Sequence, residues 1–348
     1  MKKKFTFSFG STVIIQPGIP VIADIIDSPN RVLVVCDTNT EYIARNIIGF
    51  QRTPICVLAP GENSKKWDSV ETILSAAHKA GLDRDGFFIA VGGGVIGDLT
   101  SFAASIYKRG AGLCIVATTL LGMIDASIGG KTGFDLFNLK NIVGTFYPAS
   151  IVFMPTQTLS TLSEREWKSG MAELIKIAVL DEDDNFLSDL EQEQNPDHES
   201  LIEFIERAVQ IKGKIIEYDP DETGFKRILL NLGHTFGHAL ESTAGLGKVS
   251  HGEAIAWGLA RACVLGQRIG ITPPDRAEKI LAILQKSGYE TGARHPLCSD
   301  MNSLLEAMQS DKKKKLNSLR FIVPALKSAV VLSAETIDPD ILHSVLDY

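Results

Sequence analysis

Short apolar runs, each ending at turn-forming residues, recur through the first half of the chain. They cover residues 31–37, 54–58, 87–91 and 113–117. Near-continuous apolar character over so few residues is typical of strands that are covered on both faces. Helical periodicity lies between the runs, as in residues 67–80. Strands that alternate with helices predict an α/β fold with a doubly wound parallel sheet.

The pattern changes after about residue 155. Apolar residues then recur at the helical spacing over residues 160–180, 199–217, 227–244, 251–270 and 275–287. Strand-like runs return only at residues 319–323 and 329–332. We therefore predict an α/β domain over residues 1–155 and a mostly α-helical domain over residues 156–348.

Composition and charge exclude several classes of function and leave the predicted fold unchanged. The 348 residues carry a formal net charge of −7, which argues against a general nucleic-acid-binding surface. The five cysteines form no CxxC pair, so we expect neither a disulfide framework nor a cysteine zinc site. Their number and spacing predict a cytoplasmic location. The N-terminal lysines precede no apolar stretch, and no run of about 18 apolar residues occurs, so we expect neither a signal peptide nor a membrane span.

A glycine-rich turn follows the run at residues 87–91. Gly92, Gly94 and Gly97 have the G-x-G-x-x-G spacing between a predicted strand and a predicted helix. Glycines let the backbone approach a pyrophosphate, and a helix N-terminus offers free N–H groups. A purely structural tight turn would show the same pattern. The acid expected about 20 residues later for the ribose is missing from residues 111–122.

Other polar residues stand at the ends of predicted strands. Asp37 ends one strand, and the segment Pro60-Gly-Glu-Asn-Ser-Lys65 follows another. Ligands of open parallel sheets collect at the carboxyl ends of the strands. We therefore expect a nucleotide that is held by several strand-end loops.

Three of the seven histidines are close in sequence: His234, His238 and His251. The first two are four residues apart and share one face of a helix, an arrangement that often binds a metal ion. Spacing alone leaves open which two imidazoles would bind, and a histidine packed in a core is the alternative for each.

A catalytic zinc usually has three protein ligands and one open position, so a carboxylate is the expected third ligand. Glu173 lies in an apolar helical run, where an unpaired charge would be costly, and Lys176 lies three residues on. A simple surface pair of Glu and Lys is the alternative. Lys131 and Lys140 flank a glycine-rich segment in the first half and point to a phosphorylated or carboxylated substrate.

These motifs together resemble the 3-dehydroquinate synthase family of the sugar phosphate cyclase superfamily. The resemblance runs nearly from end to end. It rests on Pro60-Gly-Glu62 with Lys65, Gly92–Asp98, Thr118-Thr119, Asp125–Thr132, Lys140-Asn141, Ala172–Lys176, Leu230–His238, His251-Gly-Glu253 and Asp311-Lys-Lys313.

The resemblance implies an α/β NAD domain, a helical metal domain and a reaction of the shikimate pathway. In this reaction 3-deoxy-D-arabino-heptulosonate 7-phosphate (DAHP) becomes 3-dehydroquinate and phosphate. The implied steps are oxidation by bound NAD, loss of phosphate, reduction by the same NADH, ring opening and aldol closure. The cofactors would be NAD and zinc or cobalt. A homodimer is also implied, with Arg109 reaching into the partner's site.

The resemblance also assigns residues. It implies Glu173, His234 and His251 as metal ligands, and makes His238 an active-site polar group and not a ligand. Implied substrate or catalytic residues are Arg109, Asp125, Lys131, Asn141, Lys176, Lys212, Arg227, Asn231, His238, Lys312 and Lys313. Implied NAD contacts are Asp37, Asn39, Glu62, Lys65, Gly94, Val95, Ile96, Gly97, Asp98, Thr118, Thr119, Lys131, Lys140, Thr158, Leu159, Ser160 and Thr161.

The sequence departs from the family in a few places. Residues 133–139 are unlike the usual segment between the two lysines, and one extra residue near 224 lets Lys226 and Arg227 compete for one role. Lys312 and Lys313 compete in the same way. The alternatives are a sister cyclase that makes an inosose or valiolone, a metal-dependent polyol dehydrogenase, and a binding module with a structural zinc site.

Overall fold

The computed structural model describes residues 2–26, 31–49, 52–137, 139–183, 185–193, 196, 198–224, 226–245, 247–298, 300–314 and 319–347, with the side chains of residues 309–314 excepted. The chain divides into two compact units, Met1–Trp167 and Lys168–Tyr348. The boundary between these units follows Trp167, whereas the hydrophobic pattern changes at about residue 155. The domain boundary at residue 155 therefore stays a prediction. In the described part of the chain, no helix is long and apolar enough to cross a membrane.

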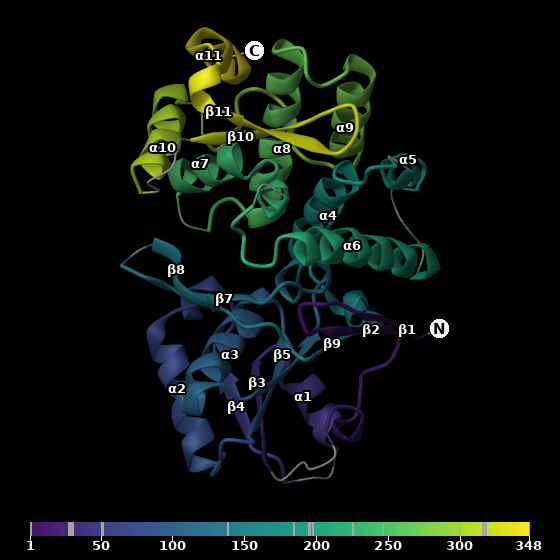
Figure 1. Ribbon diagram of the computed structural model, residues 1–348, viewed down its shortest axis with the longest axis vertical. Helices are drawn as coiled ribbons and strands as arrows, with labels where there is room; N and C mark the ends of the chain where they lie inside the picture. The colour runs from purple at the N-terminus through teal and green to yellow at the C-terminus, as the bar shows by residue number, and fades with distance from the viewer. Residues whose placement is uncertain are drawn as a thin grey trace. The chain divides into compact units, whose positions relative to one another are not determined.

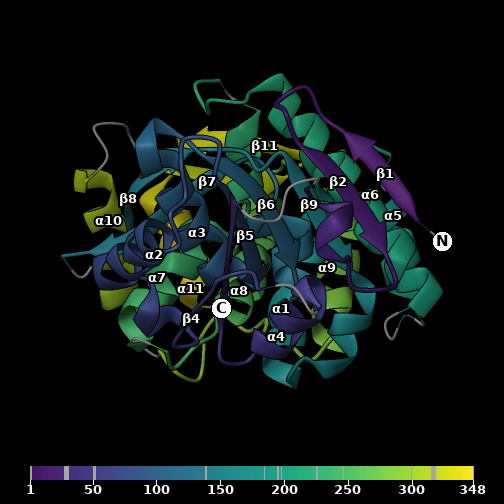
Figure 2. The ribbon, with the colours of Figure 1, turned by 90° about the horizontal axis from the view of Figure 1, so that it is seen from below.

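The first unit is built on a seven-stranded sheet with the order β1-β2-β9-β6-β5-β3-β4. Its strands are β1 (Lys3–Thr6), β2 (Thr12–Gln16), β3 (Val32–Asp37), β4 (Ile55–Leu58), β5 (Phe87–Gly92), β6 (Gly112–Ala117) and β9 (Ile151–Pro155). Strand β1 pairs antiparallel with β2, and all other neighbours pair in parallel. Figure 2 shows β5, β6, β9, β2 and β1 following one another across the sheet.

Helices cover this sheet on both faces. They are α1 (Glu41–Ile48), α2 (Trp67–Lys79) and α3 (Gly94–Ile106). On one face, Val34 and Cys36 of β3 pack with Ile43 and Ile47 of α1. Helices α2 and α3 contact each other and strands β3 to β6 on the other face. The fully apolar strands follow from this double coverage, and the predicted α/β fold class is confirmed.

A hairpin in the first unit was not expected from the sequence. Strands β7 (Lys131–Leu136) and β8 (Leu139–Phe146) form a separate antiparallel sheet. The Asp135 N–H donates to the Lys65 carbonyl at 2.7 Å, and the Asp135 carboxylate accepts the Asn141 N–H at 2.7 Å. Residues 133–136 of the unusual segment therefore belong to β7, and Asp135 ties them to the loop that follows β4.

The second unit is mostly helical, as predicted (Figure 1). Its helices are α4 (Glu164–Val179), α5 (Asn185–Gln192), α6 (His198–Tyr218), α7 (His234–Ala244), α8 (His251–Arg268), α9 (Pro274–Lys286), α10 (Met301–Lys314) and α11 (Pro339–Asp347). Strands β10 (Arg320–Pro324) and β11 (Ala329–Ser333) pair as an antiparallel hairpin. One core cluster joins Phe236 of α7, Trp257 of α8, Phe321 of β10 and Val345 of α11.

The prediction of one helix over residues 227–244 was wrong. A short 3-10 helix, η7 (Arg227–Asn231), is followed by extended Leu232 and left-handed Gly233 (φ 80°), and α7 begins only at His234. A Cβ atom on Gly233 would lie 2.8 Å from the Leu259 backbone nitrogen. The break therefore depends on a glycine that both turns the chain and touches α8.

Candidate active site

Helix α4 carries two charged residues in its most buried stretch. All residues from Ser169 to Val179 are buried, and among them Glu173 is 0% and Lys176 is 1% exposed. The Lys176 Nζ forms an ion pair with Oε2 of Glu173, one helical turn away. The two are therefore not a surface pair. Each charge offsets the cost of burying the other.

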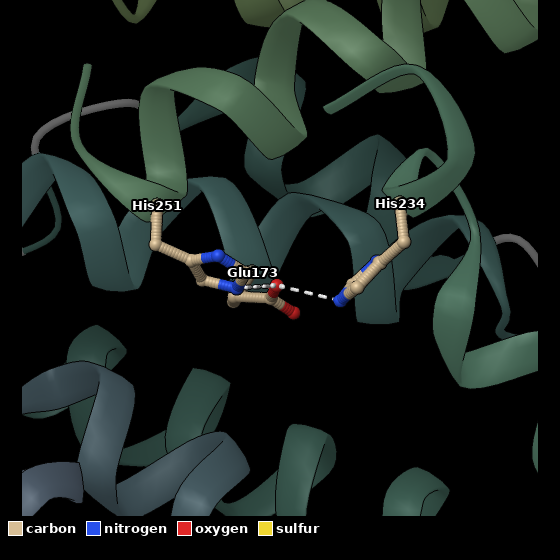
Figure 3. Close-up of side chains that lie close together, drawn as sticks. All are labelled: Glu173, His234 and His251. Carbon is tan, nitrogen blue, oxygen red and sulfur yellow. Dashed lines mark ion pairs between the residues drawn. The ribbon is translucent and has the colours of Figure 1, made fainter. Parts of the chain in front are cut away.

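Two imidazoles approach the same carboxylate from two other helices (Figure 3). His251 Nε2 lies 3.4 Å from Glu173 Oε1, and His234 Nε2 lies 4.0 Å from it. His234 is the first residue of α7 and His251 the first residue of α8. One potential ligand atom from each of the three residues falls within 4.8 Å of the others. The structure thus brings together the three residues that were expected to bind a metal.

Glycine contacts bring these three helices close together. A Cβ atom on Gly252 would lie 2.3 Å from the Ser169 Cα of α4, and one on Gly258 would lie 2.1 Å from the Gly233 carbonyl oxygen. The Gly252 N–H also donates to Ser169 Oγ at 3.1 Å. Because only glycine permits such close approach, these contacts set the spacing of the residues next to them, including His234 and His251.

The two imidazoles differ in their charge. Burial lowers the pKa of His234 well below its usual 6.5, and the nearby Lys176 ammonium acts in the same direction. Burial also opposes a charge on His251, but Glu173 and Glu241 outweigh it and raise the pKa of His251 to about 9. A metal ligand must be neutral imidazole, so a cation that binds here displaces a proton from His251.

His238 lies beside this group but does not approach Glu173 in the same way. It is exposed, and its ring centroid is 5.1 Å from that of His234. It also forms a second possible metal-binding group, with Glu241 and His251. Glu241 Oε1 lies 3.5 Å from His251 Nδ1. The sequence places the Glu241 carboxylate near the histidines, two helical turns after His234 and on the same face, but it does not predict the contact with His251.

The cations of the second unit occupy different environments. Lys212 and Arg227 are buried, and Arg227 donates to the Pro220 carbonyl. Lys226 is half exposed and pairs with Glu182 at 3.6 Å. Of the two competing residues, Arg227 is thus the buried one. Lys312 and Lys313 belong to α10, but their side chains lie outside the described residues, and Asn231, half-buried, ends η7.

The loop that leads to Arg227 is organised by a residue that the sequence reasoning missed. The Asp219 carboxylate accepts the N–H groups of Thr223 at 3.0 Å, Gly224 at 2.9 Å and Arg227 at 3.1 Å. The Gly224 bond contributes most to lowering the pKa of Asp219. The sequence Asp219-Pro-Asp-Glu-Thr-Gly224 has turn-forming composition and is the signal that would have indicated this loop.

The glycine-rich turn of the first unit forms as predicted, between β5 and α3. A Cβ atom on Gly93 would lie 3.0 Å from the Thr119 methyl, and one on Gly94 would lie 3.2 Å from the Ala126 Cβ, whereas Gly97 has open space. These glycines line a small pocket with Gly122 and residues that follow β6. Val95 and Ile96 continue the first turn of α3. A turn so free of side chains leaves the helix N-terminus accessible to a phosphate.

A buried ion pair lies next to this turn. The Lys65 Nζ is 2.6 Å from Asp98 Oδ2. Burial raises the pKa of Asp98 to about 6, although Lys65 opposes the shift and Glu62 adds to it. The structure therefore brings together three of the residues expected to contact NAD, from two strand-end loops.

Several other expected NAD contacts already form hydrogen bonds within the protein. Asp37 Oδ1 accepts the Asn39 and Thr40 N–H groups at 2.9 and 3.0 Å, and so holds the turn that precedes α1. The Thr158 hydroxyl donates to the Thr118 carbonyl at 3.1 Å. Ser160 and Thr161 donate to carbonyls of their own 3-10 helix, η6 (Thr156–Thr161), which also contains Leu159.

The remaining expected substrate residues of the first unit lie on its turns and hairpin. Arg109 is exposed and left-handed (φ 71°) in η4 (Tyr107–Arg109), and Asn141 is left-handed (φ 51°) in β8. Lys131 begins β7, and Lys140 lies beside Asn141. Asp125 lies in a π-helical turn, η5 (Gly122–Ala126), which is often found at functional sites.

Comparisons with known proteins cover both units. The family model described as the 3-dehydroquinate synthase N-terminal domain matches residues 55–169, and the model of the C-terminal domain matches residues 170–314. The 3-dehydroquinate synthase of Methylacidiphilum infernorum is 41% identical over 263 residues, which are 76% of this chain and 72% of that protein.

Two solved structures share the fold at a TM-score of 0.84. One is the 2-epi-5-epi-valiolone synthase ValA of Streptomyces hygroscopicus with NAD⁺ and Zn²⁺ bound, 25% identical, with 99% of this chain and 96% of that chain covered. The other is a 2-deoxy-scyllo-inosose synthase complexed with carbaglucose-6-phosphate, NAD⁺ and Co²⁺, 27% identical, with 99% of both chains covered. The two family models, which together span residues 55–314, and the relative at 41% identity show that this chain belongs to the 3-dehydroquinate synthase family.

Proposed function

We propose that the chain is a 3-dehydroquinate synthase, which converts DAHP to 3-dehydroquinate and phosphate with bound NAD and a divalent metal ion. The observation that carries the proposal is the family match over both units together with the cluster of Glu173, His234 and His251. The first unit would hold NAD and the second the metal. Both cyclases with a similar fold have NAD⁺ and Zn²⁺ or Co²⁺ bound.

The residues present fit a zinc or cobalt ion. Two imidazole nitrogens and one carboxylate oxygen are the donor set of many catalytic zinc sites, which keep one position for a substrate. Glu173 is fully buried, and its oxygen faces both ring nitrogens at 3.4 and 4.0 Å. When bound, the metal supplies a Lewis acid that polarises the hydroxyl to be oxidised.

The residues around this cluster would bind substrate and move protons. Lys176 forms a buried ion pair with Glu173 and would offer its amino group to an anionic substrate. His238 is exposed beside His234 and is suited to exchange protons with solvent. Lys212, Arg227 and Asn231 would bind the carboxylate and hydroxyls, with a lysine of the pair at 312 and 313 adding to phosphate binding.

The first unit would hold the nucleotide at the turn between β5 and α3. The absence of side chains at Gly93, Gly94 and Gly97 leaves room for a pyrophosphate. NAD, when bound, accepts a hydride and returns it within one turnover. Lys131 and Asn141, on the hairpin that Asp135 ties to the Lys65 loop, would bind the substrate phosphate.

A homodimer completes the proposal. Arg109 is exposed at the end of α3, in a turn where Lys108, Arg109 and Gly110 all have positive φ. The Tyr107 hydroxyl donates to the Leu82 carbonyl at 2.9 Å and keeps this turn in place. An exposed guanidinium on such a fixed turn is suited to reach the phosphate in a partner's site. The buried free cysteines are in keeping with a cytoplasmic location.

The test measures phosphate release by the purified chain with NAD and zinc. We expect release from DAHP and none from glucose 6-phosphate or sedoheptulose 7-phosphate. Release from either sugar phosphate alone would identify a sister cyclase. The NADH absorbance should show no net change during turnover, whereas a polyol dehydrogenase would accumulate NADH. Turnover retained by His251→Ala after loss of the metal would support a structural zinc site.

A further inference from the structure

His251 lies between two carboxylates that approach opposite sides of its ring. Nε2 lies 3.4 Å from Glu173 Oε1, and Nδ1 lies 3.5 Å from Glu241 Oε1. The Glu173 side chain is 0% exposed and the Glu241 side chain 12%, whereas that of His251 is 34% exposed. Glu241 comes from α7 and His251 from α8, so the contact also links the two helices that carry the imidazoles.

A carboxylate beside one ring nitrogen determines the state of the other. Neutral imidazole carries its proton on one nitrogen, and the other nitrogen has the free lone pair. An acceptor at Nδ1 keeps the proton there, so that Nε2 presents its lone pair to the side on which Glu173 and His234 lie. The same hydrogen bond restrains rotation of the ring and makes Nε2 a better donor to a metal.

We propose that Glu241 is a positioning residue, which accepts the Nδ1–H of His251 and so aims Nε2 at the metal position formed with Glu173 and His234. The inference rests on the proposed function only in that it needs a metal at this position. It assigns no contact between Glu241 and the substrate.

A second metal site formed by some of the same residues would require the opposite protonation of His251. Glu241, His238 and His251 also offer ligand atoms that lie within 4.8 Å of one another. If these three residues bound a second metal ion, Nδ1 of His251 would carry no proton, and Glu241 would be a ligand. The proposed role therefore requires one metal ion per chain and a proton on Nδ1.

The test compares zinc affinities of the full chain by competition with a chromogenic chelator. We expect Glu241→Ala to raise the zinc dissociation constant by about 10- to 100-fold, the usual effect of losing a group that orients a ligand. Glu241→Gln keeps an acceptor oxygen but loses the charge, so a smaller rise is expected. The matched control is Glu253→Gln, two residues after His251.

Glu253→Gln is a suitable control because the substitution removes one carboxylate charge near His251 without changing the group beside Nδ1. The Glu253 carboxylate accepts the Ser250 N–H at 2.8 Å in a capping box, and glutamine preserves that motif. The control should bind zinc as the wild type does. Thermal unfolding in EDTA shows whether each variant folds, and a folded Glu241→Gln keeps the test valid if Glu241→Ala does not fold.

A second readout follows the tautomer itself. With ¹⁵N-labelled histidine, the zinc-loaded wild type should show His251 protonated at Nδ1, and Glu241→Ala should lose or weaken that signal. The inference is overturned if Glu241→Ala binds zinc as tightly as Glu253→Gln, or if the wild type binds two zinc ions and the variant one. A wild type that binds no zinc would instead refute the proposed function.

Discussion

Gly252 of α8 follows His251 and lies against the backbone of Ser169 in α4, which is one helical turn before Glu173. A Cβ atom on Gly252 would lie 2.3 Å from the Ser169 Cα and 2.6 Å from the Ser169 carbonyl oxygen. These atoms belong to the backbone of a buried helix and have no rotamer to change. Gly252→Ala therefore has to separate the two helices at the point where they present two of the proposed metal ligands.

The size of the shift follows from the contact distance. Ordinary contact begins at 3.4 Å, so the helices must move apart by about 1 Å. Metal–ligand distances tolerate deviations of only about 0.2 Å. We therefore expect the zinc dissociation constant to rise by roughly 10- to 100-fold, as when ligand-orienting groups are lost, and kcat/KM to fall about 100-fold, the cost of a misplacement of this size.

The effect on folding is expected to be much smaller. Overpacking costs about 1–3 kcal/mol, and exchanging glycine for alanine in a helix returns up to about 1 kcal/mol. The free energy of unfolding in EDTA should thus fall by about 0–2 kcal/mol. At roughly 2–4 °C per kcal/mol, calorimetry should show a decrease in Tm of less than about 8 °C.

Two controls separate the overlap from other effects. Ser169→Ala removes the hydroxyl that accepts the Gly252 N–H at 3.1 Å but adds no atom at the contact, so its zinc affinity should stay within a few-fold of the wild type. Gly18→Ala places a methyl group where nothing lies within 4 Å and should leave activity unchanged. Wild-type zinc affinity in Gly252→Ala would refute the idea that this contact positions the ligands.

Three further predictions test other parts of the proposal. Arg109→Ala and His251→Ala should each be inactive. Random dimers from an equal mixture should regain about a quarter of wild-type activity, because half of them are heterodimers and each heterodimer has one complete site of two. No recovery of activity would place Arg109 in its own subunit's site. Lys176→Met leaves the buried Glu173 carboxylate beside an apolar side chain. Urea unfolding in EDTA should therefore show a free energy of unfolding lower by about 3–5 kcal/mol, and added zinc should largely restore it. An equal loss in the presence of zinc would contradict a metal next to Glu173. The raised pKa of Asp98, about 6 against the ordinary 3.8, contributes stability that is fully present below pH 3.8 and lost as the pH rises through 6. The stability of the wild type relative to Asp98→Asn should therefore fall between about pH 4 and 6, and a rise over this range would refute the shift.

The strands of the first unit could be predicted because their burial shows in the sequence. Val32 to Asp37 is covered on both faces, and no solvent-facing side breaks its apolar run. Strand β8 gives no such signal, because most of its residues are exposed, among them Ile142 and Phe146. Its pairing with β7 is a contact between neighbours that neither apolar runs nor helical spacing reveals.

The break before α7 was missed for a different reason. Residues 227–244 have helical spacing throughout, and a single glycine inside such a pattern is usually tolerated at a cost of about 1 kcal/mol. Gly233 instead adopts φ 80° because α8 passes against it, with the Leu259 nitrogen at 2.8 Å from a Cβ placed there. The cause lies in a helix that follows later in the chain, so local sequence could not supply it.

The choice of imidazoles shows the same limit of local spacing. His238 is four residues from His234 and shares its helix face, and the two ring centroids are 5.1 Å apart, while His251 lies 5.6 Å from His234. Ring proximity therefore does not distinguish the two candidates and, taken alone, slightly favours His238. The buried Glu173 carboxylate does distinguish them, because its oxygen faces Nε2 of His251 and of His234, while His238 is exposed. A cation at that carboxylate would balance its buried charge, and the imidazoles within reach of it are the ones that could share the ion. The position of Glu173, on a helix some 60 residues earlier in the sequence, thus favours His234 and His251 over the pair that helix spacing alone would select.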